Sequence, residues 1–154
     1  MPAKLSNSAL REIEPLSADE LIGPAVKRLI ESDLPGLPAV ESDGSFAGIF
    51  GEREFMTALF PGYVGELGSS AMIKRSIDVV IERRETCTGE PIRRYLTTDH
   101  VVVEDDYSDT RMAELFLHHR VLVIPIATAG NVHAVVTRGD FFRELAGKLL
   151  TASS

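Results

Sequence analysis

The chain contains two copies of one sequence pattern, and this duplication limits its possible folds more than any other feature. In the first copy, an apolar segment with Pro38 precedes a polar turn, a second apolar segment and an acidic stretch that ends at Phe55. The second copy repeats this order from Pro125 to Phe141. The prolines lie 87 residues apart and the phenylalanines 86, so the second turn is one residue shorter. Such self-similarity predicts two equivalent structural units.

Each copy predicts the element order β-α-β-β-α over roughly 50 residues. Before each proline, apolar residues recur at helical spacing, and Ser108 or Asp109 can cap the second of these helices. Runs of β-branched and aliphatic residues predict buried strands at 101–103, 121–124 and 134–136. Asp43-Gly44 and Gly130-Asn131 are typical of hairpin turns.

Length, composition and charge exclude several classes of protein. The 154 residues suffice for one compact domain or two small ones. Apolar residues make up 44% and charged residues 25%, which excludes disordered, collagen-like and coiled-coil chains. The net charge of −7 argues against DNA or RNA as a partner, because such binding needs a basic face. No apolar run is long enough to span a membrane.

The N-terminus and the single cysteine favour a cytoplasmic protein. Residues 1–10 carry no apolar core or cleavage pattern of a secretory signal. Cys87 has no partner for an intrachain disulfide and no zinc-site spacing. We expect this thiol to be a spectator, with a redox sensor as the alternative.

The two repeats resemble a pair of CBS domains, also called a Bateman module. The resemblance is carried by 134–142, where an apolar run leads into Thr137-Arg138-Gly139-Asp140, and by 119–126, which leads into Pro125. It implies an α/β (α+β) fold in which two tandem repeats pack sheet to sheet with pseudo-two-fold symmetry. We therefore expect a stand-alone pair of this kind. Its expected parts are an N-terminal arm (1–12), a degenerate first repeat (13–60), a helical insert (61–90), a second repeat (91–150) and a tail (151–154).

The resemblance also implies a ligand site in the second repeat. In this family the motif Asp binds the ribose hydroxyls of an adenosine-containing ligand, the motif Thr lies near its phosphate, and main-chain groups hold the base. Both motif positions are filled in the second repeat. The residues carried over are Thr98, Asp99, Val101, Val121, Val123, Thr137, Arg138 and Asp140. An alternative is that Thr137 and Asp140 only cap a helix.

The first repeat departs from this motif. Gly51 stands at the Thr position and lacks a hydroxyl, and Glu54 stands at the Asp position and is one methylene longer. We therefore expect a degenerate first cleft.

Between the repeats, 76–84 predicts a helix capped by Ser76, whereas 65–68 reads as a loop. Basic pairs such as Lys74-Arg75 alternate with acids in this insert, which indicates a solvated face or a dimer rim.

The adjacent His118 and His119 point about 100° apart on a helix, so we expect no metal site. No nucleophilic or dinucleotide-binding motif is present in the sequence, and we expect no enzyme activity.

These observations predict a non-enzymatic regulatory module, a homodimer with no required cofactor. It would sense AMP, ADP, ATP, NAD or S-adenosylmethionine in the cleft of the second repeat and signal to an unknown partner by a conformational or dimer change. The alternative is a ligand-free structural or protein-interaction module. The eroded first repeat favours that alternative.

Overall fold

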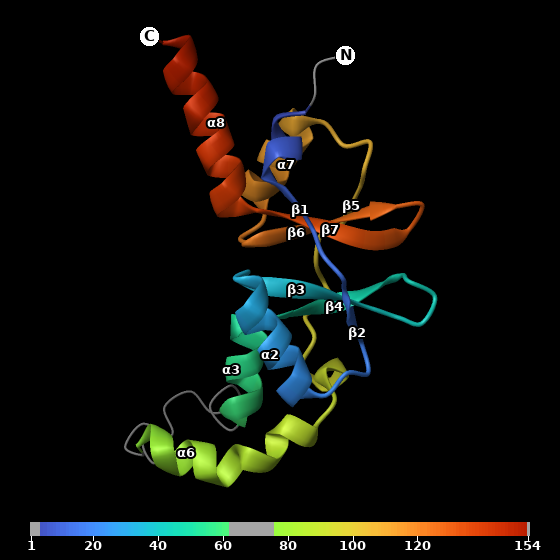
Figure 1. Cartoon of the computed structure of the whole chain (residues 1–154), viewed down its shortest axis with the longest axis vertical. Coiled ribbons are helices and arrows are strands. Elements are labelled where there is room, and N and C mark those ends of the chain that lie inside the picture. The colour runs from blue at the N-terminus through green and yellow to red at the C-terminus, as the bar shows by residue number, and fades with distance from the viewer. Residues whose placement is uncertain (1–3, 62–75, 154) are drawn as a thin grey trace.

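Two β-sheets lie face to face at the centre of the molecule, and helices cover their outer sides (Figure 1). The structure is a computed structural model, which describes residues 4–61 and 76–153. The first repeat comprises β2 (Leu16–Ser17), α2 (Ile22–Ser32), β3 (Gly36–Val40), β4 (Phe46–Gly51) and α3 (Glu52–Leu59). The second comprises β5 (Val103–Glu104), α7 (Asp109–His118), β6 (Val123–Thr128), β7 (Asn131–Thr137) and α8 (Arg138–Ala152). This confirms the predicted order of elements.

The strand pairing follows the same plan in both repeats. The first strand of each runs parallel to the second, which forms an antiparallel hairpin with the third. Pro38 lies opposite Ile49, and the equivalent Pro125 lies opposite Val135. The repeats of the sequence are therefore also repeats of the structure, related by a pseudo-two-fold axis.

A short segment that precedes each repeat joins the sheet of the other repeat. The chain begins with α1 (Leu5–Ala9) and β1 (Leu10–Glu12), and β1 pairs antiparallel with β7, with Arg11 opposite Val135. Before the second repeat, Thr97 forms an isolated antiparallel bridge with Ile49 of β4. Figure 1 shows the chain running from β1 in one sheet to β2 in the other. These crossings place residues of both repeats around the same clefts.

The hairpin turns depend on backbone conformations that favour glycine. Gly44 has φ 88° in the first turn, and Ala129 and Gly130 have φ 51° and 82° in the second. The sequence predicted Gly130-Asn131 at the second turn, but Asn131 is already the first residue of β7. The turn is therefore shifted by one residue.

Two of the predicted strands begin later than expected. β5 starts at Val103 and β6 at Val123, and the residues before them form no regular strand, with a bend at Leu122. The carbonyl of Leu122 accepts a hydrogen bond from the backbone N–H of Arg138 at 2.9 Å instead of pairing with a neighbouring strand. This contact fixes the chain just before β6 against the start of α8.

The hydrophobic core is continuous between the sheets. Val123 and Val135 of the second repeat are buried in one cluster with Leu37, Ile49 and Phe50 of the first. A Cβ at Gly36 would lie 3.6 Å from Cγ1 of Val123, so β3 and β6 approach closely. A shift of one sheet against the other would therefore disturb this core.

The insert supplies α6 (Ile77–Arg84) and two 3-10 helices, η1 (Glu85–Gly89) and η2 (Ile92–Arg94). The Oγ of Ser76 accepts from the N–H of Val79 at 3.4 Å, which confirms the predicted cap. The expected loop at 65–68 and the pair Lys74-Arg75 lie outside the described residues. Within 4–61 and 76–153, none of the helices combines the length and apolarity that crossing a membrane requires.

Candidate functional site

A cleft of about 580 Å³ lies between the two repeats, and both contribute to its walls. The first repeat supplies the start of β3 and the first turn of α3, and the second supplies the chain before β5 and before β6. The residues of the lining whose polar or main-chain groups could contact a ligand include Glu54, Asp99, His100, Arg120, Val121 and Val123. We call this cavity the central cleft.

Glu54 is the motif acid of the first repeat and is fixed by two neutral hydrogen bonds. Its Oε1 accepts from the N–H of Gly51 at 2.9 Å, and its Oε2 accepts from the Thr97 hydroxyl at 2.7 Å. The first contact is one half of a capping box at the start of α3, because Gly51 has no side chain to supply the reciprocal bond. The residue is only 9% exposed, yet it lines the central cleft. The carboxylate is thus rigidly placed at the cleft wall.

Gly51 stands at the motif Thr position because no side chain fits there. A Cβ would lie 2.4 Å from the Pro35 carbonyl oxygen and 2.9 Å from Cα of Gly36, which are both backbone atoms. At the equivalent position Thr137 has room, and its hydroxyl accepts from the N–H of Asp140 at 3.0 Å. The difference between the two motifs therefore has a steric cause.

Asp140 is the motif acid of the second repeat, and it forms an ion pair. Its Oδ2 accepts from Nε of Arg11 at 2.8 Å, and its Oδ1 accepts from Nη2 of Arg11 at 3.2 Å. Nη1 of Arg143 reaches Oδ1 at 3.3 Å. The hydrogen bonds from Arg11 hold the pKa of Asp140 below its usual range, and partial burial opposes this shift. The Asp140 side chain is 18% exposed.

The structure divides the predicted site residues between two places. Asp99, Val121 and Val123 line the central cleft together with Glu54 of the first repeat. Asp140 instead borders a smaller pocket of about 270 Å³, beside Arg11 and Arg143. The sequence analysis had grouped all of these around Asp140, because it did not foresee that the chain before each repeat crosses to the other sheet.

The other predicted residues lie at the edges of these two places. Thr98 is exposed, and its carbonyl accepts from the N–H of His100 at 3.1 Å. Val101 packs against the core of the second repeat. Thr137 and Arg138 form the N-terminus of α8, and Arg138 is exposed. As a helix cap, Thr137 has the structural role that the sequence analysis named as the alternative.

His100 lines the central cleft and was not identified from the sequence. Its Nε2 lies 2.8 Å from the carbonyl oxygen of Val123, which accepts the hydrogen bond. Burial lowers the pKa of His100, and the bond to Val123 partly offsets that shift. A neutral imidazole therefore joins the chain before β5 to the start of β6.

Arg11, Thr97 and Arg120 were also missed. A signal for the first two was present, because Arg11 and Thr97 are 86 residues apart, the same offset that relates Glu54 to Asp140. Extending the repeat alignment upstream of the helices would have paired them.

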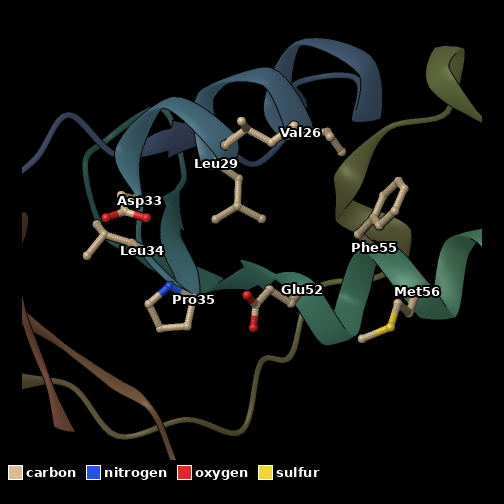
Figure 2. Close-up of a pocket in the computed structure, with 9 residues that line it drawn as sticks. Val26, Leu29, Asp33, Leu34, Pro35, Glu52, Phe55 and Met56 are labelled. Carbon is tan, nitrogen blue, oxygen red and sulfur yellow. The ribbon is translucent and has the colours of Figure 1, made fainter. Parts of the chain in front are cut away.

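A second hollow of about 700 Å³ lies between α2 and α3 of the first repeat. Figure 2 shows Val26 and Leu29 of α2 on one side and Phe55 and Met56 of α3 on the other. The charged groups in its lining are the carboxylates Asp33 and Glu52, and among the described residues no arginine or lysine lines it to hold a phosphate. This groove is larger than the central cleft, but its chemistry suits an apolar side chain better than a nucleotide.

Neither a family model nor a curated protein matches the chain. Solved structures do match. A CBS domain-containing protein of unknown function from Kribbella flavida has a TM-score of 0.72 at 19% identity, covering 94% of this chain and 98% of that one. An acetoin utilization protein (AcuB), described as putative, from Vibrio cholerae has a TM-score of 0.70 at 17% identity, covering 100% and 98%.

A third match is the protein CBSX2, whose structure is a complex with AMP. The TM-score is 0.66 at 17% identity, and the match covers 95% of this chain and 98% of that one. These matches cover 94% to 100% of the chain, which is more than one repeat alone could supply. Together with the paired β-α-β-β-α repeats, they show that this chain has the fold of a CBS domain pair.

Proposed function

We propose that this chain is a non-enzymatic regulatory module that binds an adenosine-containing ligand in the central cleft. One observation carries the proposal: the fixed carboxylate of Glu54 lines the same cleft as Arg53 and Arg120. The main chain just before β6 lines it as well. Its volume of about 580 Å³ falls within the roughly 300–1,000 Å³ of small-molecule sites. A protein of the same fold has been solved with AMP, which supports this ligand class.

Each part of an adenosine ligand has a counterpart in the cleft. A carboxylate can accept two hydrogen bonds from a vicinal diol, and Glu54 keeps lone pairs beyond its two present bonds. Arg53 and Arg120 are exposed guanidinium groups at the cleft, suited to a phosphate. The irregular chain at 121–122, which lines the cleft, offers main-chain groups for a base. We place the site at Glu54 rather than Asp140, because Asp140 already has a cationic partner.

The proposal is tested by thermal melts with AMP, ADP, ATP, NAD and S-adenosylmethionine. A ligand present at 100 times its Kd adds about 2.7 kcal/mol of stability, so the Tm should rise with concentration. Arg120→Ala and Leu122→Trp should reduce the rise, the first by removing charge and the second by filling the cleft. If none of the five ligands raises the Tm of the unaltered chain, the proposal is wrong.

Matched controls separate this effect from general changes in stability. Arg83→Ala removes an exposed arginine from α6, which does not line the cleft and lies apart from the two sheets in Figure 1. Leu149→Trp enlarges an exposed leucine of α8, outside the cleft lining. Both control variants should keep the full ligand-induced rise in Tm.

The second candidate function is a ligand-free structural or interaction module that acts through dimerisation. Both motif acids have protein partners, which favours this alternative. Phe142, Leu145 and Leu149 also leave an apolar strip exposed along α8, as a homodimer interface would require. Sedimentation of the chain with and without AMP distinguishes the candidates. A dimer that Phe142→Glu converts to monomer, with no response to any nucleotide, would favour the second.

A further inference from the structure

The two motif acids are held by residues at equivalent positions but of different charge. Thr97 bridges to Ile49 and contacts Glu54, while Arg11 pairs with Val135 and contacts Asp140. Arg11 precedes Thr97 by 86 residues. Val135 and Asp140 follow Ile49 and Glu54 by the same number. Position 11 is thus the place in the second repeat that the Thr97 hydroxyl occupies in the first.

The two contacts leave the acids in different chemical states. Thr97 donates one neutral hydrogen bond, and the charge of Glu54 stays available to a ligand. Arg11 donates two hydrogen bonds from a cation and so neutralises Asp140 in place. Arg143 adds a weaker contact from an exposed side chain.

A ribose diol would compete with Arg11 for the carboxylate oxygens of Asp140, which accept two hydrogen bonds from Arg11 and one from Arg143. The diol brings two neutral donors, whereas charge-assisted hydrogen bonds are roughly twice as strong as neutral ones. The Arg11 side chain is 42% exposed, so the cost of displacing Arg11 is the lost ion pair and not a buried, unpaired guanidinium. No such exchange is needed at Glu54, where both present donors are neutral.

We propose that Arg11 closes the motif of the second repeat to adenosine ligands, so that the chain binds a single ligand, at Glu54. This inference rests on the proposed function. A neutral hydroxyl at position 11 would give Asp140 the kind of partner that Thr97 is to Glu54 and leave the charge of Asp140 available to a second ligand.

The experiment is a calorimetric titration with AMP, read as ligands bound per chain. We expect one for the unaltered chain and two for Arg11→Thr, which copies Thr97 and suits a strand. The double variant Arg11→Thr/Asp140→Asn should return to one. Arg143→Thr removes the other arginine at Asp140 and should stay at one, as should Arg11→Lys, which keeps the positive charge. A thermal melt of each variant checks that it is folded.

The outcomes separate this inference from the proposed function. If the unaltered chain and Arg11→Thr both bind one AMP, Arg11 does not exclude the ligand, although the site at Glu54 stands. If the unaltered chain already binds two, the inference is overturned in the same way. If Arg11→Thr binds one AMP and the unaltered chain none, Arg11 does exclude the ligand and the site at Glu54 is wrong. If neither binds, both ideas are wrong.

Discussion

Gly51→Ala should destabilise the protein, even though the backbone at Gly51 is of a kind that alanine adopts freely. Its φ of −142° and ψ of −163° are ordinary extended values. The obstacle is space, since the new Cβ would lie 2.4 Å from the Pro35 carbonyl oxygen and 2.9 Å from Cα of Gly36. Because both are backbone atoms, no side-chain rotation relieves the contact, and the start of β3 must move.

The size of the effect follows from the contacts that this movement breaks. Overpacking costs about 1–3 kcal/mol. The Pro35 carbonyl also accepts the N–H of Glu52 at 3.1 Å, and losing that bond costs about 0.5–1.5 kcal/mol. Alanine restricts the unfolded chain, which offsets about 0.4–1 kcal/mol. We expect a net loss of about 2 kcal/mol and a Tm lower by roughly 4–8 °C.

Urea unfolding followed by circular dichroism measures this loss. Gly147→Ala is the matched control, because Gly147 is exposed within α8 and a Cβ there meets nothing within 4 Å. It should stabilise the chain by about 0.5–1 kcal/mol through helix propensity. If Gly51→Ala is as stable as the unaltered chain, the steric explanation for the missing motif hydroxyl is refuted. Gly51→Thr, which would restore that hydroxyl, should be destabilised at least as much.

Three further predictions concern titration and reactivity. The unaltered chain should be more stable than Arg11→Thr by its full margin above about pH 5, and this margin should shrink as the pH falls below about 4. The reason is that the pKa of Asp140 is lowered in the fold, so its ion pair stabilises the fold only while the carboxylate is charged. Urea unfolding across this pH range measures the margin. Burial lowers the pKa of His100, so protonation favours the unfolded chain, and stability should fall as the pH drops below about 6.5. His100→Gln should weaken this loss, and an equal pH dependence in both proteins would contradict the assignment. Cys87 is 4% exposed, and burial raises the pKa of its thiol. A disulfide reagent should therefore modify Cys87 far more slowly in the folded protein than in urea. Equal rates of modification would show that the thiol is accessible in the fold.

Local sequence signals predicted the repeated elements well. Ser76 and Ser108 cap their helices as expected, since a hydroxyl that accepts the third N–H is a short-range interaction. The order β-α-β-β-α followed from apolar spacing and turn residues, which also act over a few residues. Strand starts were less accurate at Val103 and Val123, because strand bounds depend on the partner strand as well as on composition.

The site could not be assembled from local signals. Leu10–Glu12 is a strand of three residues with no distinctive pattern, and its pairing with β7 spans more than a hundred residues of sequence. The repeat offset relates Arg11 to Thr97, but no local signal shows that Arg11 would meet Asp140. His100 likewise lies in a polar stretch, and only the approach of β6 gives its imidazole a carbonyl partner. Long-range pairing decided which motif acid faces which segment.

A single ligand in the central cleft would contact both repeats, because the walls of that cleft come from both. Gly36, Ile49 and Glu54 belong to one sheet and its helix, while Val121 and Val123 belong to the other repeat. A ligand bound to both walls has a different affinity for each relative position of the sheets, and it shifts their equilibrium by that difference alone. The shared core at Val123 and Val135 makes intermediate positions costly. If the proposed ligand fills the central cleft and Arg11 closes the motif at Asp140, one bound ligand is enough to select one arrangement of the pair.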